Sequence, residues 1–218
     1  MKGLFIKDFR LLLLQKNFLL LVFGAAVGMI LFTDDSTFPL GFMCFIVSLF
    51  VISTISYDDF DNGSAFLFTL PITRKSYVVE KYLLGLILGC GSWVIATIIS
   101  IASVIVKGTM SVTGLMMSAA MILPAVLLIQ AVTIPFVLKF GGERGRIALL
   151  GALGALILLG VIIVKGAKAV FNVDPLEALD AISSAGMGVF IAAAAAISLA
   201  LFFVSMMTGI YIMKKKEF

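Results

Sequence analysis

Long apolar runs separated by short charged segments dominate the pattern along this chain of 218 residues. A transmembrane helix needs roughly 20 apolar residues, each rising ~1.5 Å. Six runs without Asp, Glu, Lys or Arg approach or exceed that length, which predicts an all-α, polytopic membrane protein with six transmembrane helices. These runs are Phe18–Phe32, Phe38–Ser56, Tyr82–Val106, Leu115–Leu138, Ile147–Val164 and Ala185–Met213.

Composition supports one integral membrane domain. Apolar residues make up 62% of the chain and charged residues 13%, whereas a soluble domain has about 45–50% and about 25%. With so few charges the chain cannot cover its own surface in water, so we expect a lipid bilayer around it. Residues 1–17 are expected to form an interfacial helix, residues 18–213 the six-span bundle, and residues 214–218 a cytoplasmic tail.

Several kinds of chemistry are excluded by residue types that are missing. The chain has no histidine, so it has no His-ligated metal site and no Ser-His or Cys-His catalytic pair. Cys44 and Cys90 lie in apolar runs, where we expect small buried hydrophobic residues. The phosphate-binding motif G-x-x-x-x-G-K-[ST] does not occur. We therefore expect no catalytic residue, metal or cofactor on this chain, which is not an enzyme by itself.

The distribution of Lys and Arg predicts the orientation. These residues number 13 in the N-terminal segment, the second and fourth connections and the C-terminal tail, but 3 in the remaining connections. Positive residues concentrate on the cytoplasmic side of membrane proteins. Six spans with this split place both termini in the cytoplasm. The net charge of +4 then reflects topology, and we expect no binding to nucleic acid.

The first 17 residues have a moderately amphipathic helical pattern. On a helical wheel, one side holds Phe5, Ile6, Phe9, Leu12 and Leu13, and the other holds Lys7, Asp8, Arg10 and Gln15. This pattern favours a helix in the cytoplasmic interface that leads into the first span, over a frayed basic tail.

The connection from Tyr57 to Lys81 is the longest on the predicted cytoplasmic side. After the turn signal Asn62-Gly63, Ser64 is expected to cap a short apolar helix that Pro71 ends. Such a helix is too short to span the membrane and needs a surface to cover it. That surface is the lipid interface, the bundle itself or a second protein, and the pattern favours lipid and protein docking equally.

Two other connections carry candidate features. Residues 139–146 form a short, basic, glycine-rich segment that is either a second docking point or a solvated turn, the commoner case. On the opposite side, Asp174, Pro175 and Glu177 fit the N-cap, N1 and N3 positions of a helix. They predict a short outer helix between spans five and six, which either caps an exit or anchors the chain at the interface.

Polar and small residues inside the spans indicate close helix packing. Gln130 lies between Pro124 and Pro135, and we favour an interhelical hydrogen bond for it over a role in a substrate path. Small residues at four-residue spacing, such as Gly85 and Gly89, let helices approach closely and suggest a tight bundle or a dimer. The other such positions are Gly24 and Gly28, Gly151 and Ala155, and Ala192, Ala196 and Ala200.

The order of these elements resembles the permease subunit of ABC-2 type ATP-binding-cassette exporters. The resemblance covers nearly the whole chain. It is carried by the N-terminal stretch Met1–Arg10, the acidic run Asp58–Asp61, and the segment from Leu70-Pro71-Ile72-Thr73-Arg74 to Glu80-Lys81-Tyr82. The chain is most similar to small permeases of bacterial peptide exporters, such as those for phenol-soluble modulins.

The resemblance implies roles for particular residues and partners. A coupling helix between spans two and three would dock on the ATPase, and the turn between spans four and five would make a smaller contact. Two permeases, identical or different, and two nucleotide-binding ATPase subunits would form the working unit, with ATP and Mg on the partner subunit. The residues implied are Ser64, Phe66, Leu67, Leu70, Pro71, Arg74 and Lys75 for the coupling helix, Gly141, Glu143 and Arg144 for the second contact, and Asp174, Pro175 and Glu177 for the outer helix.

The leading hypothesis is therefore a permease in the bacterial plasma membrane that exports an amphipathic or hydrophobic cargo, such as a peptide. Charge-free spans suit such a cargo. A secondary carrier built from three-plus-three inverted repeats has the required span count, but no polar binding centre appears at the midplane. A membrane immunity or interaction protein without ATP coupling is a third hypothesis.

Overall fold

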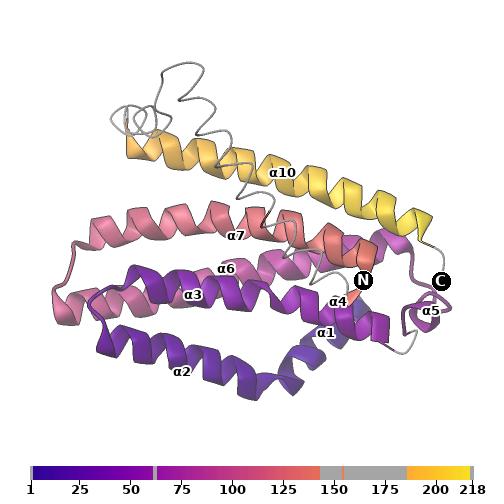
Figure 1. Cartoon of the computed structure of the whole chain (residues 1–218), viewed down its shortest axis with the longest axis horizontal. Coiled ribbons are helices and arrows are strands. Elements are labelled where there is room, and N and C mark those ends of the chain that lie inside the picture. The colour runs from indigo at the N-terminus through magenta and orange to yellow at the C-terminus, as the bar shows by residue number, and fades with distance from the viewer. Residues whose placement is uncertain (1, 61–62, 143–153, 155–185, 217–218) are drawn as a thin grey trace.

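Helices form all the regular structure that the computed structural model describes, which covers residues 2–60, 63–142, 154 and 186–216 (Figure 1). The apolar runs account for this, because a backbone inside a bilayer must satisfy its own hydrogen bonds. The described helices are α1 (Lys2–Leu14), α2 (Lys16–Phe32), α3 (Thr37–Ser48), α4 (Phe50–Asp59), α5 (Gly63–Leu67), α6 (Arg74–Lys107), α7 (Val112–Phe140) and α10 (Met187–Lys215).

Four described segments are long and apolar enough to cross a membrane: α3 with α4, α6, α7 and α10. A further span is possible where α1 and α2 join, because this pair passes the same test but bends by 64°. The predicted span Ile147–Val164 lies outside the described residues, apart from Gly154. The all-helical membrane fold is thus confirmed, while the count of six spans stays a prediction.

Helix α6 is much longer than the apolar run that predicted it. It begins at Arg74, where the Thr73 side chain caps it by accepting a hydrogen bond of 3.1 Å from the Ser76 backbone N–H. At ~1.5 Å per residue, its 34 residues extend over roughly 50 Å, well beyond a hydrocarbon core of ~30 Å. The first turns of α6, which carry Glu80 and Lys81, therefore belong to the edge of the membrane.

Gln130 joins three helices in the middle of the bundle. Its Nε2 donates to Ser48 Oγ on α3 and to the Gly85 carbonyl on α6, both at 2.8 Å. A Cβ at Gly85 would lie 2.9 Å from Gln130 Oε1, and one at Gly89 would lie 3.1 Å from Val126. The predicted interhelical hydrogen bond and the close approach at this glycine pair are both confirmed.

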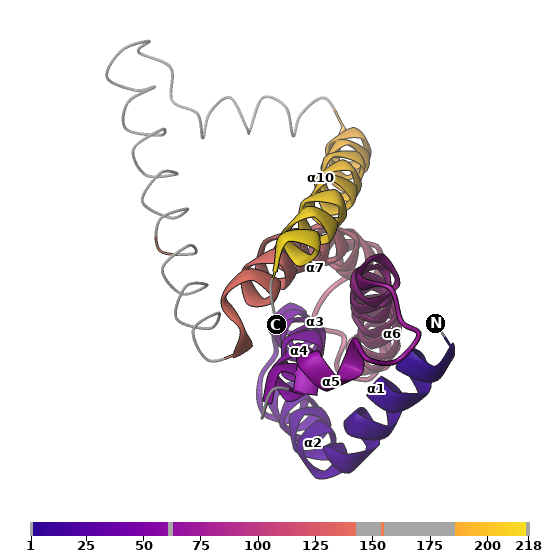
Figure 2. The ribbon, with the colours of Figure 1, turned by 90° about the vertical axis from the view of Figure 1, so that its right-hand side faces the viewer.

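The other small-residue pairs behave differently. A Cβ at Gly24 or Gly28 would meet no atom of the described chain within 4 Å. Ala192, Ala196 and Ala200 are exposed on α10, which lies against α7 and on the opposite side of the bundle from α2 (Figures 1 and 2). Within the described chain, four-residue spacing of small residues therefore marks a close helix contact at Gly85 and Gly89 but not at the other described positions.

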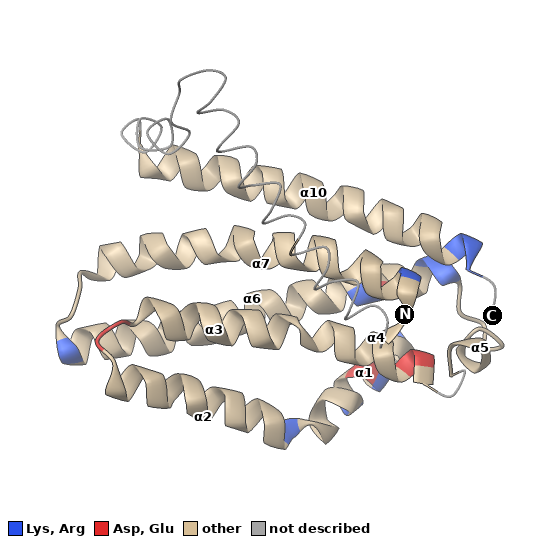
Figure 3. Cartoon of the chain, viewed as in Figure 1, with Lys and Arg blue, Asp and Glu red and all other residues tan. Residues whose placement is uncertain are grey.

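Both ends of the chain lie at one end of the bundle (Figure 1). The same end holds α5, the start of α6 and the ends of α7 and α10, and most of the described Lys and Arg residues gather there (Figure 3). We call this end of the bundle the charged end. Helix α6 runs from there to the opposite end, where Lys107 is its last residue. Most of the described Lys and Arg residues thus gather at the end that the sequence predicts to face the cytoplasm.

Candidate functional site

A buried group of charged side chains holds three helices together at the charged end. Lys7 and Asp8 come from α1, Asp58 from α4, and Glu80 and Lys81 from α6. We call these five residues the ion cluster. Asp8, Glu80 and Lys81 have no solvent-exposed surface, and Asp58 is 8% exposed. Such burial is rare for charged residues unless they are paired.

Lys81 is at the centre of the ion cluster. Its Nζ donates a hydrogen bond to Asp8 Oδ2, lies 2.8 Å from Asp58 Oδ2, and donates to Thr54 Oγ1 at 3.2 Å. The Lys7 Nζ pairs with Asp58 Oδ1 and lies 3.1 Å from Asp8 Oδ1. These two lysines therefore bridge the carboxylates of α1 and α4.

Two further groups complete this site. The Tyr77 hydroxyl donates to Asp58 Oδ2 at 3.0 Å, and the Tyr77 ring lies 5.2 Å from Lys81 Nζ. Neither carboxylate oxygen of Glu80 accepts a hydrogen bond from a described residue, and Lys81 Nζ lies 3.8 Å from its Oε2. Lys7 and Lys81 are the counter-charges of Asp8 and Asp58, so Lys81 cannot be lost without leaving buried negative charge.

The inward face of α1 differs from the predicted one. Leu4, Asp8 and Leu12, spaced four residues apart, are its buried residues, whereas Ile6 and Phe9 are exposed. The predicted placement of Asp8 and Leu12 on opposite sides of the helix is therefore wrong. The physical reason is Lys81 on α6, which pairs with this carboxylate, and helical periodicity alone does not reveal a buried cation.

The predicted coupling helix is shorter than expected. Helix α5 runs from Gly63 to Leu67, and a turn then leads to a bend at Leu70 and Pro71. Ser64 is the second residue of this helix and is buried, so it is not the residue that precedes and caps it. The prediction that the helix continues to Leu70 is likewise wrong, because the backbone already turns at Phe68.

Apolar side chains around α5 point away from the bundle. The exposed fractions are 53% for Tyr57, 73% for Phe60, 70% for Phe66 and 44% for Leu70. We call these four residues the end patch. Tyr57 lies next to Asp58 near the end of α4. Phe60, Phe66 and Leu70 follow α4 and precede Arg74, so this part of the end patch lies beyond the ion cluster and outside the apolar spans. Large exposed apolar side chains at such a place mark an interaction surface.

Other residues of this connection face inward. Leu67, Phe68 and Ile72 pack against the core. The guanidinium of Arg74 lies 5.9 Å from the centre of the Phe68 ring and donates to the carbonyls of Met213 at 3.2 Å and Lys214 at 2.9 Å. Arg74 thus ties the start of α6 to the end of α10.

The predicted docking residues therefore divide into two groups. Phe66, Leu70, Pro71 and Lys75 are exposed, whereas Ser64 is buried and Leu67 and Arg74 are partly buried. Gly141 ends α7 with a φ of 81°, and a Cβ there would lie 3.3 Å from Asp59 Oδ2 on α4. The remaining predicted site residues, Glu143, Arg144, Asp174, Pro175 and Glu177, lie outside the described residues.

The ion cluster was not predicted from the sequence. The N-terminal stretch, the acidic run after Tyr57 and the Glu80-Lys81 pair are separate motifs along the chain, and the structure brings their charges together. The signal that was available is that all three motifs carry charges next to apolar runs. Within the described ranges, no group of Cys, Asp and Glu could hold a metal ion.

Comparison with known proteins identifies a family. Residues 3–214 match the family model described as "ABC-2 family transporter protein". No curated protein matches the chain, and no solved structure matches it either.

Proposed function

Because the chain belongs to the ABC-2 transporter family, we propose that it is the permease subunit of an ATP-driven exporter whose ATPase is a separate protein. In this proposal the end patch at the charged, cytoplasmic end is the docking surface for the nucleotide-binding subunit. The cargo is amphipathic or hydrophobic, with a peptide as the leading candidate, and two permease subunits work together. ATP and Mg bind to the partner.

The observation that carries this proposal is the position of the end patch relative to the ion cluster. Helix α5 connects α4 to α6. Asp58 of α4 is paired with Lys7 of α1, and Lys81 of α6 is paired with both Asp8 of α1 and Asp58. In this proposal a displacement of α5 acts on α4 and α6, which the buried charge pairs tie to α1. It reaches the first apolar helix, α2, through the bend after α1.

Such a connection can couple ATP binding to the arrangement of the spans. A ligand shifts an equilibrium between two conformations only by its difference in affinity for them. A docked ATPase that changes shape with ATP binding supplies that difference at α5, and packed helices respond by discrete rearrangements. The spans themselves offer apolar walls, since Gln130, their most polar side chain, is already bonded to Ser48 and Gly85.

The docking surface is tested by replacing both Phe66 and Leu70 with Asp. Two charges placed on the apolar contact area require desolvation that no partner compensates, so we expect co-purification with the nucleotide-binding subunit from the same genome to fall at least tenfold. Membrane insertion should be unchanged, because both side chains are exposed outside the spans.

The matched control is Phe32→Asp. This change affects an exposed phenylalanine at the last residue of α2, far from the charged end. This variant should co-purify with the ATPase like the wild type. If the Phe66 and Leu70 variant also binds the ATPase normally, the end patch is not the docking surface.

A further inference from the structure

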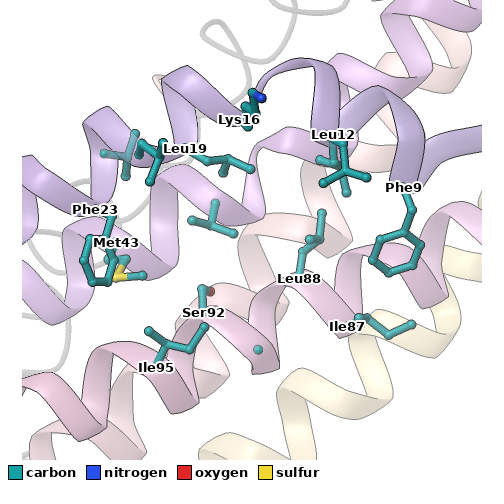
Figure 4. Close-up of a pocket in the computed structure, with 15 residues that line it drawn as sticks. Phe9, Leu12, Lys16, Leu19, Phe23, Met43, Ile87, Leu88, Ser92 and Ile95 are labelled. Atoms are coloured by element: carbon teal, nitrogen blue, oxygen red, sulfur yellow. The ribbon is translucent and has the colours of Figure 1, made fainter.

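An apolar groove opens where α1 bends into α2. It has a volume of about 500 Å³, and its walls come from α1, α2, α3 and α6 (Figure 4). That volume falls within the range of about 300–1,000 Å³ that is common for small-molecule sites. Its lining is apolar except for Ser92 and Lys16. The Ser92 hydroxyl is already bonded to the Gly89 carbonyl at 2.9 Å.

The groove fits within the depth of one membrane leaflet. Along α6 its lining runs from Ile87 to Ile95, and along α2 from Lys16 to Phe23. At ~1.5 Å per residue these stretches cover roughly 12 Å and roughly 10 Å, and the hydrocarbon of one leaflet measures about 15 Å, half of a ~30 Å core. The first of them begins six residues after Lys81, so the groove starts just inside the charged end.

Lys16 is the one charged residue in this lining. It is exposed at the bend between α1 and α2 and makes no ion pair with any residue in the described ranges. In Figure 4 its amine lies at the edge of the lining, above the apolar side chains that line α3 and α6. A lysine at this level extends its amine towards the headgroups while its stem stays in apolar surroundings.

We propose that this groove binds a phospholipid with an anionic headgroup, taken from the leaflet at the charged end. One acyl chain lies along the apolar wall between α2 and α6, and the headgroup phosphate pairs with the Lys16 ammonium. The match in depth selects a lipid of a single leaflet, and the unpaired cation at the shallow end selects negative charge. This binding site is additional to the ATPase contact and the cargo path of the proposed function.

Such a lipid would stabilise the bend between α1 and α2. The groove walls include Phe9 and Leu12 on one side of the bend and Leu19 and Phe23 on the other. An acyl chain packed between them fills space that would otherwise separate the two helices from α6. The lipid composition of the membrane would then influence the same helix that the ion cluster holds.

Native mass spectrometry of the intact chain, titrated with phosphatidylglycerol or phosphatidylcholine, tests this proposal. The quantity measured is the dissociation constant of the first bound lipid. We expect phosphatidylglycerol to bind about fivefold more tightly than phosphatidylcholine, the effect of one basic residue near an anionic headgroup. Lys16→Gln should reduce this ratio to about one. Lys2→Gln, which changes an exposed cation of α1 outside the groove, should leave it unchanged.

A second pair of variants tests the groove itself. A Cβ at Gly91 meets no described atom within 4 Å, so Gly91→Leu fills the groove without a clash in the described chain. It should weaken binding of both lipids at least tenfold. Gly24→Leu, equally unhindered but outside the groove, is the control and should have no effect.

The proposal fails if Lys16→Gln keeps the preference for phosphatidylglycerol, or if Gly91→Leu binds both lipids normally. It also fails if Gly91→Leu changes the oligomeric state while lipid affinities stay the same, because the groove would then be an interface between two copies of the chain. Loss of peptide transport in Gly91→Leu with unchanged lipid binding would assign the groove to cargo instead. Normal ATPase docking in all these variants is expected, which separates this test from that of the end patch.

Discussion

Lys81 shows how far one residue can depart from what its sequence context indicates. It lies next to the apolar run that begins at Tyr82 and counts among the positive residues that predict a cytoplasmic connection. In the structure it has no exposed surface and contacts carboxylates from two other helices. The desolvation of such a cation is offset only by well-placed counter-charges, so its environment depends on Asp8 and Asp58 at once.

Replacing Lys81 with Met tests this dependence. The change preserves an unbranched side chain but leaves the Asp8 and Asp58 carboxylates with Lys7 as their remaining counter-charge. Removing one partner of a buried ion pair costs about 3–5 kcal/mol, and we expect a loss of that size in the free energy of unfolding, measured by denaturant titration in detergent micelles.

The control for this prediction is Lys75→Met on the same helix, where the lysine is exposed and the cost should stay below about 0.5 kcal/mol. Equal stability of the two variants would show that the ion cluster does not hold the three helices together.

At the scale of elements, the sequence predicted the apolar helices well and their ends and faces less well. The apolar runs indicated α3 with α4, α6, α7 and α10 because the lipid environment demands long stretches without charge. The start of α6 was missed because the helix begins before its apolar run, at the cap that Thr73 provides. The inward face of α1 was missed because Asp8 is buried by a partner far away in the sequence.

The contact between α6 and α7 gives a prediction about these elements. Gly85→Leu places a side chain where a Cβ alone would lie 2.9 Å from Gln130 Oε1 and 3.4 Å from Val51. Overpacking of this kind costs about 1–3 kcal/mol or more, and it should also break the bond from Gln130 to the Gly85 carbonyl. We expect a clearly lower midpoint of thermal unfolding in detergent.

Gly91→Leu is the matched control for this contact, because it makes the same substitution on the same helix at a position with open space. Its thermal midpoint should equal or exceed that of the wild type, since leucine favours a helix more than glycine does. A midpoint for Gly85→Leu as high as that of Gly91→Leu would mean that the two helices do not approach closely there.

At the scale of the whole molecule, the candidate site combines features with different degrees of predictability. The exposed part, Phe66 and Leu70, was expected because a short apolar segment between charged residues needs a covering surface. Tyr57 and Phe60 complete the end patch but were not expected, because their exposure depends on how α4 ends. The ion cluster was not expected either, since it joins α1 to segments more than 50 residues away along the chain. The local sequence pattern thus predicts which segment needs a covering surface, whereas the fold determines which residues lie together in the site.

The orientation of the molecule in the membrane is a prediction that labelling tests directly. The chain has two native thiols, Cys44 and Cys90, which would be replaced by Ala. A single cysteine is then introduced at Thr69, next to α5, or at Thr109, in the connection between α6 and α7; both positions are exposed.

A maleimide that cannot cross the membrane should label Thr109→Cys in intact cells and Thr69→Cys only after permeabilisation. This pattern follows because the positive residues gathered at the charged end favour the cytoplasm. The opposite pattern would place the end patch outside the cell, where no ATP-hydrolysing subunit can reach it, and both the orientation and the docking proposal would fall together.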